Sequence, residues 1–269
     1  MNSLRLGGVP EHFNLPWHLA IESDALSDLD LSWEDQPGGT GAMLASLDAG
    51  ELDMVSILTE GTVLAIDQGA PLTIMQVYVQ SPLRWGVHVP AASRFQAEDE
   101  LAEARIAISR FRSGSHLMSF VFANRMGWTI DDDQFVVIGN LDGARESFAA
   151  AESDLFLWDR YMTQVLVDNG EFRRVGVQVT PWPSFVFAAR NEVIESSGEQ
   201  VTRVIDEVVS QALGLHARPS IIDDLTGRYD IDAATAQEWL DVTEFAERGP
   251  VDQEMLSSTL ATLRSAGFS

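Results

Sequence analysis

The sequence of 269 residues contains no lysine and no cysteine, so all 17 of its basic residues are arginines. The absence of lysine excludes a Schiff-base nucleophile and the lysine of a phosphate-binding loop. The absence of cysteine excludes disulfides, thiolate nucleophiles and cysteine-ligated zinc sites. Acidic residues number 41, which gives a net charge of −24. Because phosphate backbones must be neutralised by basic residues, this charge argues against a nucleic-acid-binding protein.

Signals for membrane insertion, export and metal binding are also missing. No apolar run approaches the roughly 20 residues of a membrane-spanning helix, so we expect no membrane insertion. The chain begins Met1-Asn2-Ser3 without a basic leader or an apolar stretch with a cleavage site. This start predicts a cytoplasmic protein, or a periplasmic one if a leader has been removed. The five histidines lack metal-ligand spacing and residues 131–133 do not match a calcium loop, so we expect no metal and no cofactor.

Short apolar segments alternate with helical patterns over the first 190 residues, which predicts an α/β fold. The strands are predicted at 4–8, 29–33, 52–58, 72–79, 85–89, 105–109, 135–138 and 154–158. Helices are predicted after Pro16 and Thr40 and over 117–126 and 142–151. Apolar residues at helical spacing then predict a long helix over 193–213 and shorter ones over 233–245 and 252–266. The length fits one large domain or two lobes, at roughly 150 residues per domain.

Two loops in the first half carry candidate ligand-binding residues, because open α/β sheets bind ligands at the carboxyl ends of their strands. The loop 7–17 would offer a ring nitrogen, an amide and a flat ring from His12, Asn14 and Trp17. The alternative for this loop is a tight turn with polar surface groups. The glycine-rich segment 37–41 would let a ligand approach the backbone, and its candidates are Gly39, Thr40 and Gly41. We expect Thr40 to cap a helix whose N-terminus attracts an anion.

Three further segments extend the candidate site. Thr59 follows a strand and would either line a cleft or cap the next helix. The segment 109–116 combines two arginines with small polar residues that could clamp an anion, and its candidates are Ser113, Ser115 and His116. The alternative is that these arginines only offset nearby acids. Trp158 ends a predicted strand and could stack on a flat ligand, although most tryptophans lie in cores.

Several segments resemble the type II periplasmic-binding-protein family. In the first half these are GGVPEHFNLPW, PGGTGAM, GELDMVSILTEG and VQSPLRWGVHV. SRFRSGSHLMSFVFA and DLFLWDRYMTQVLVDNGEFRRVG extend the resemblance through the second half. The sequence is similar to the branch that binds nitrate, sulfonates and thiamine-pyrimidine precursors. Within it, the sequence most resembles a leaderless subgroup of bacterial and fungal members that includes a Candida protein.

The resemblance implies a two-lobed fold with a helical C-terminal segment. Residues 1–88 would form the first part of lobe 1, residues 89–180 lobe 2, and residues 181–269 the return to lobe 1 with the C-terminal helices. The chain would cross between the lobes near 87–90 and 177–184, and the lobes would close by hinge motion around a ligand. The implied function is non-catalytic binding of a small anionic or heteroaromatic metabolite, as in the substrate-binding proteins of ABC transporters, with an ABC permease as a partner.

Two alternatives stay open. The same fold carries enzymes of pyrimidine and menaquinone pathways, and in a cytosolic enzyme Glu11 or Glu60 could serve as the acid or base. The pyrimidine-precursor synthases use a pyridoxal phosphate lysine and a cysteine-rich motif, and this chain has neither. We therefore assign no catalytic residue. The third possibility is a module that binds a protein partner through its acidic surface.

Overall fold

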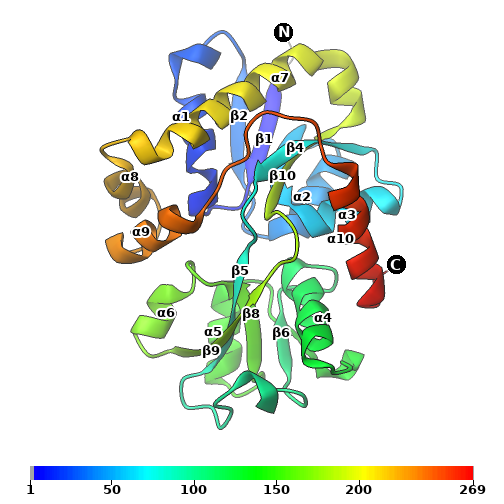
Figure 1. Ribbon diagram of the computed structural model, residues 1–269, viewed down its shortest axis with the longest axis vertical. Helices are drawn as coiled ribbons and strands as arrows, with labels where there is room; N and C mark the ends of the chain where they lie inside the picture. Colours follow the sequence, from blue (N-terminus) through cyan, green and yellow to red (C-terminus); the bar gives the residue numbers. More distant parts are fainter. Residues whose placement is uncertain (1–2, 269) are drawn as a thin grey trace.

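The computed structural model describes residues 3–268, so Met1 and Asn2, which entered the expectation about a leader, lie outside it. Two five-stranded sheets form two lobes, one above the other in Figure 1. The sheet of lobe 1 has the order β2-β1-β3-β10-β4, with β1, β2 and β3 parallel and β10 antiparallel to both of its neighbours. Its strands are β1 (Leu4–Gly8), β2 (Leu31–Asp35), β3 (Met54–Leu58), β4 (Leu72–Val79) and β10 (Phe185–Arg190), and its helices are α1 (Leu15–Ile21), α2 (Gly39–Asp48) and α3 (Thr59–Asp67).

Lobe 2 repeats this arrangement with the strand order β7-β6-β8-β5-β9. Strands β6, β7 and β8 are parallel, and β5 is antiparallel to β8 and β9. In both lobes, therefore, the loops at the carboxyl ends of parallel strands gather at one edge of the sheet. The strands are β5 (Arg84–Pro90), β6 (Ile106–Ile108), β7 (Phe135–Val137), β8 (Leu155–Asp159) and β9 (Phe172–Val179), and the helices are α4 (Gly114–Met126), α5 (Leu141–Ala149) and α6 (Gln164–Asp168).

Four helices form the C-terminal segment and pack on lobe 1 (Figure 1). The long helix α7 (Asn191–Gly214) lies against α1, because Val201, Val204, Ile205 and Val208 form one buried stripe. Helix α10 (Gln253–Ser265) packs on α3. The other two are α8 (Ile221–Arg228), which the sequence reasoning did not predict, and α9 (Ala233–Val242). The α/β fold with two lobes and a helical C-terminal segment is thus confirmed.

The chain crosses between the lobes over residues 80–83 and 180–184. The second crossing lies inside the predicted range, but the first comes earlier than the predicted 87–90. The reason is that β5 pairs with β8 and β9 along most of its length and is therefore part of the second sheet.

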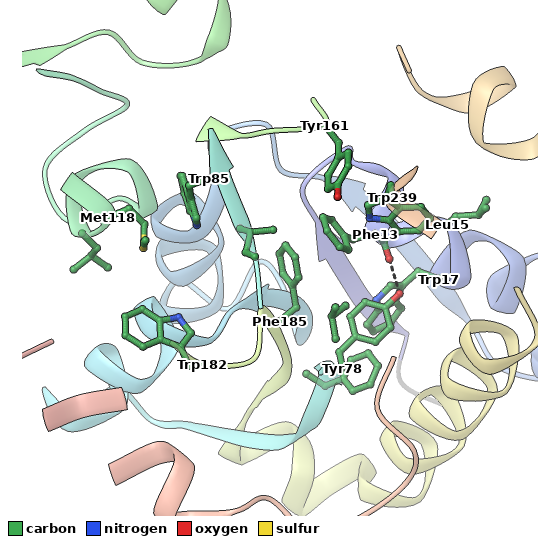
Figure 2. Packing of buried hydrophobic residues seen from close by; sticks show 14 of the residues in the cluster. Phe13, Leu15, Trp17, Tyr78, Trp85, Met118, Tyr161, Trp182, Phe185 and Trp239 are labelled. Atoms are coloured by element: carbon green, nitrogen blue, oxygen red, sulfur yellow. Dashed lines mark hydrogen bonds between the residues drawn. The ribbon is translucent and has the colours of Figure 1, made fainter. Parts of the chain in front are cut away.

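One continuous set of buried apolar side chains runs through both lobes. Figure 2 shows its central part, where Tyr161 of lobe 2 lies near Phe13 and Trp239 of lobe 1. The Tyr78 hydroxyl donates a hydrogen bond of 2.6 Å to the Phe13 carbonyl oxygen and so fixes the loop after β1. The ring of His12, in the same loop, lies 6.1 Å from that of Tyr161. The two lobes are therefore in contact, with the strand-end loops between them.

Within residues 3–268, no helix combines the length and the apolar character needed to cross a membrane.

Candidate ligand-binding cleft

A cavity of about 60 Å³ lies between the two lobes. At 10–15 Å³ per water-sized sphere, it has room for roughly four to six groups of that size. Strand-end loops of both lobes line it, which is where ligands bind in open α/β sheets. The lining residues are Val9, Glu11, Pro37, Gly38, Gly39, Thr40, Met43, Leu58, Leu83, Trp85, Ser109, Arg110, Ser113, Gly114, Ser115, Trp158, Asp159 and Phe185.

The N-terminus of α2 forms one wall. Gly39 has a φ of 67°, a left-handed conformation that favours glycine, and this turn directs the chain into the helix. The prediction that Thr40 caps α2 is wrong, because Gly38 occupies the cap position and no side chain caps the helix. Thr40 is instead buried inside the first turn. The N–H groups of an uncapped first turn are open to an anionic ligand.

The N-terminus of α4 forms the opposite wall, in lobe 2. Ser113 caps this helix by accepting a hydrogen bond of 3.3 Å from the backbone N–H of His116. The Ser115 hydroxyl lies 3.0 Å from the Ser113 hydroxyl and accepts a hydrogen bond from the backbone N–H of Ser109. These hydroxyls can reorient toward a bound oxygen atom. Two helix N-termini from different lobes therefore line the same small cavity.

Arg110 adds a full positive charge to this side of the cavity. It follows β6 in lobe 2, yet its Nη1 atom donates a hydrogen bond across the cleft to the carbonyl oxygen of Gly38 in lobe 1. Its Nη2 atom is buried and has no hydrogen-bond partner. Burial lowers the pKa of Arg110, but an arginine remains protonated in proteins. We call Arg110 and the first turns of α2 and α4 the anion-binding half of the cavity.

Two carboxylates line the cavity as well, one from each lobe. Glu11 follows β1 and is partly accessible, whereas Asp159 ends β8 and is only 5% exposed. Asp159 Oδ1 accepts hydrogen bonds from the backbone N–H groups of Tyr161 and Met162, at 2.9 and 2.8 Å. Asp159 Oδ2 is buried and has no partner. We call Glu11 and Asp159 the acidic half of the cavity.

Burial raises the pKa of both carboxylates. Desolvation, together with the negative charge of Asp159, raises the pKa of Glu11 to about 8. Desolvation raises the pKa of Asp159 to about 6, against the opposing effect of its two backbone hydrogen bonds and of Arg174 and Arg160. The pair therefore keeps a proton at higher pH than two exposed carboxylates would, and the larger shift is that of Glu11.

The structure brings five of the eleven predicted binding residues to the cavity and leaves six outside its lining. Those at the cavity are Gly39, Thr40, Ser113, Ser115 and Trp158. Those outside are His12, Asn14, Trp17, Gly41, Thr59 and His116.

Three of the outside residues hold the loop after β1 and the helix that follows it. Asn14 Nδ2 donates a hydrogen bond of 2.7 Å to the Val9 carbonyl oxygen, which constrains the loop that carries Glu11. His12 is fully buried among aromatic rings, and burial lowers its pKa to about 3. Trp17 is also fully buried, with its ring 5.3 Å from that of Phe187. These residues lie behind the cavity wall rather than on it.

The remaining three lie beside the helix N-termini. Gly41 is so close to Arg110 that a Cβ at this position would collide with the guanidinium. Thr59 is buried at the first position of α3, and Leu58 rather than Thr59 occupies the cap. His116 Nδ1 accepts a hydrogen bond of 3.0 Å from the backbone N–H of Arg112. These three residues therefore lie next to the cavity walls without lining the cavity.

Sequence reasoning did not select Asp159, Arg110 or Trp85 as binding residues. Asp159 directly follows a predicted strand, which is the same signal that selected its neighbour Trp158. Arg110 lies within the segment 109–116, which was proposed to clamp an anion, and Trp85 begins the predicted strand 85–89. Glu60, considered as a catalytic acid, is buried outside the cavity, where its Oε2 accepts a hydrogen bond of 2.8 Å from Trp182 Nε1.

No group of three or more histidine, aspartate or glutamate side chains that could hold a metal ion occurs among residues 3–268. The two cavity carboxylates alone supply too few ligands for a hard cation, which takes six or more oxygens.

The protein is similar to known proteins in its fold and in the sequence of its second lobe. Residues 85–178 match the model of the Ca3427-like periplasmic-binding-protein (PBP) family. The Candida albicans CA3427 gene product, described as defining a new family with the generic periplasmic-binding-protein fold, is 29% identical with a TM-score of 0.93. The match covers 99% of this chain and 90% of that chain. No curated protein matches the sequence.

Two more distant structures share the fold. The alkanesulfonate-binding protein SsuA of Xanthomonas axonopodis pv. citri, bound to MOPS, is 19% identical with a TM-score of 0.82, over 97% of this chain and 90% of that one. PhnD1 of Prochlorococcus marinus, in complex with methylphosphonate, is 15% identical with a TM-score of 0.65, over 99% of both chains. The chain therefore has the two-lobed periplasmic-binding-protein fold, and its second lobe carries the sequence pattern of the Ca3427-like family.

Proposed function

We propose that this protein binds a small anionic metabolite between its two lobes and releases it when the lobes open. The observation that carries the proposal is the anion-binding half of the cavity. Two helix N-termini and one guanidinium, contributed by both lobes, converge there. Because each lobe supplies part of the anion site, the ligand stabilises the closed arrangement over the open one.

The size of the cavity limits the class of ligand. A cavity of about 60 Å³ favours a compact ligand, such as a carboxylate, sulfonate or phosphonate with a short chain. The neighbouring Trp85, Trp158 and Phe185 supply apolar walls. The similar structures with bound MOPS and methylphosphonate support a sulfonate or phosphonate headgroup.

The test is thermal shift followed by calorimetry against a panel of small carboxylates, sulfonates and phosphonates. A ligand at a hundred times its dissociation constant stabilises the folded state by about 2.7 kcal/mol. We expect at least one hit, recovered unchanged after incubation and lost in Arg110→Gln. Small-angle scattering with and without the hit measures closure directly. A panel without hits, or a hit that Arg110→Gln leaves intact, contradicts the proposal.

The second candidate function is an enzyme, and one observation favours it. Glu11 holds a proton near neutral pH within a closed cavity, which suits a general acid. In that case a panel hit is consumed, and Glu11→Gln abolishes turnover while leaving binding measurable. Recovery of the unchanged hit excludes this candidate.

As a partner for the binder we propose a membrane permease of the ABC type. One solved relative with a TM-score of 0.75 is described as the ligand-binding component of an ABC-type import system from Staphylococcus aureus. Co-purification of a permease with the ligand-loaded protein, but not with the Arg110→Gln variant, is the expected result. Absence of any membrane partner in both states contradicts the proposal.

A further inference from the structure

We propose that the ligand is a compact zwitterion, with its anionic group in the anion-binding half and its ammonium group between Glu11 and Asp159. This inference rests on the proposed function, because it names the class of ligand for the same cavity. It addresses a feature that anion binding alone leaves unexplained, namely two carboxylates in a cavity built for a negative charge.

The strongest evidence is the unused oxygen of Asp159. The side chain is 95% buried, and Oδ1 is occupied by two backbone N–H groups. Oδ2 lacks any partner, although the residue lines the cavity. A buried carboxylate oxygen without a donor is costly, so a donor supplied by the ligand would remove a penalty that the empty protein carries. An ammonium group supplies up to three donors and a positive charge.

Among residues 3–268, no arginine forms an ion pair with Glu11 or Asp159. Arg160 forms its ion pair with Glu238, at 2.8 Å. Arg174 donates hydrogen bonds to the Gln164 side chain and to the Arg160 carbonyl oxygen. Both guanidiniums lower the pKa of Asp159 through space, yet burial dominates and raises it. Within the described part of the chain, no guanidinium pairs with Asp159 Oδ2, which leaves that oxygen available to a cationic group of the ligand.

The spacing of the two halves follows from the order of the strands. Glu11 follows β1, which lies next to β2 with the α2 turn at its end. Asp159 ends β8, which lies next to β6 with Arg110 at its end. Neighbouring strands lie ~4.8 Å apart, so in each lobe the acidic and the anion-binding residues follow strands that are a short distance apart. One to three methylene groups span such a distance, and apolar walls such as Leu83 and Trp85 suit such a spacer.

A divalent cation is a poorer occupant of the acidic half. Two carboxylates from opposite lobes provide few ligands, and no third acidic or histidine side chain among residues 3–268 joins them. An ammonium group is satisfied by two or three oxygen acceptors, which this pair supplies.

The test compares three zwitterions with the same anions lacking the amino group, by calorimetry on the full chain at pH 7. The pairs are taurine and ethanesulfonate, β-alanine and propionate, and 2-aminoethylphosphonate and ethylphosphonate. We expect at least one zwitterion to bind about ten- to a hundred-fold tighter than its partner, as for hydrogen bonds between charged groups. We also expect its binding to release protons, because a nearby ammonium drives the Glu11 proton off.

Two variants locate the effect. Glu11→Gln and Asp159→Asn keep the side-chain shape, and the asparagine still offers Oδ1 to the two backbone N–H groups. Each should reduce the preference for the zwitterion about ten-fold while anion binding persists. Glu60→Gln is the matched control, because Glu60 is buried but lies outside the cavity, and it should keep the full preference.

The outcomes are separable. If an anion binds as tightly as its zwitterion, the inference is overturned and the proposed function stands. If no compound of the three pairs binds, the inference is overturned, and the wider anion panel decides the proposed function separately. A preference that survives in Glu11→Gln and Asp159→Asn, or that is lost in Glu60→Gln, also overturns the inference, because the acidic half would not be its source.

Discussion

The buried carboxylate of Glu11 should destabilise the empty protein at neutral and alkaline pH, so that Glu11→Gln increases its stability. The pKa of Glu11 is raised from 4.5 to about 8, chiefly by burial and secondly by Asp159. Glutamine has nearly the same shape and does not ionise. The substitution therefore removes the cost of charging this group and leaves the packing in place.

The sign and size follow from proton linkage. Between pH 4.5 and 8 the folded state holds a proton on Glu11 that the unfolded state has released. The free energy of unfolding therefore falls as the pH rises through this range. At pH 7 the full shift would cost about 3 kcal/mol. Because Glu11 is partly accessible, we expect Glu11→Gln to gain about 1–3 kcal/mol at pH 7 and nothing below pH 4.

Urea denaturation followed by tryptophan fluorescence, at pH 5, 7 and 8.5, measures this difference. The control is Glu103→Gln, which changes an exposed acid in water and should follow the wild-type curve at each pH. A gain for Glu11→Gln that grows with pH supports the reasoning. A variant less stable than the wild type at pH 8.5, or a gain independent of pH, would refute it.

Three further changes test the fold and the closed state. Burial lowers the pKa of His12 and His88 to about 3, so below pH 6.5 the unfolded state binds protons that the folded state does not. The free energy of unfolding should therefore fall as the pH falls, by up to about 1.4 kcal/mol per pH unit for each histidine. Denaturation at pH 4–7 measures this decrease. Gly41→Ala should displace the guanidinium that crosses the cleft and weaken ligand binding by about 1–3 kcal/mol in calorimetry, whereas Gly198→Ala, which meets no neighbour, should not. Phe268→Ala removes a ring that lies 5.0 Å from that of Phe120, and should favour the open state by about 1 kcal/mol, seen as an increased radius of gyration.

Most of the fold could be predicted because the signals are local. Apolar runs marked each strand of both parallel sets, and the 3.6-residue period marked α7. Helix α8 was missed because it has eight residues and only Ile221 and Leu225 of them are buried, too few to establish a period. The cap of α2 was assigned to Thr40 because capping preferences favour threonine, but the helix begins at the left-handed Gly39, so the cap lies two residues earlier, at Gly38.

The candidate site was predictable only in part, for a different reason. The rule that loops after parallel strands face the ligand identified segments, and five of eleven chosen residues lie on the cavity. It could not separate residues on the wall from those behind it, because His12 and Trp17 carry the same chemistry in either place. The pairing of Glu11 with Asp159 joins residues 148 positions apart, on different lobes. No local pattern encodes such a juxtaposition.

The charge of the whole chain and the charge of the cavity both bear on whether the ligand is a zwitterion or a simple anion. With a net charge of −24, the protein repels free anions before they reach the cleft, and an amino group on the ligand reduces this repulsion by one unit of charge. Among the described residues that line the cavity, Arg110 is the one basic side chain beside two acids, so an anion alone would leave the closed site more negative than it began. An ammonium group on the ligand offsets this excess at the oxygen of Asp159 that has no partner. Glu11 and Asp159, whose burial destabilises the empty protein, are thus the groups that would distinguish a zwitterion from a simple anion.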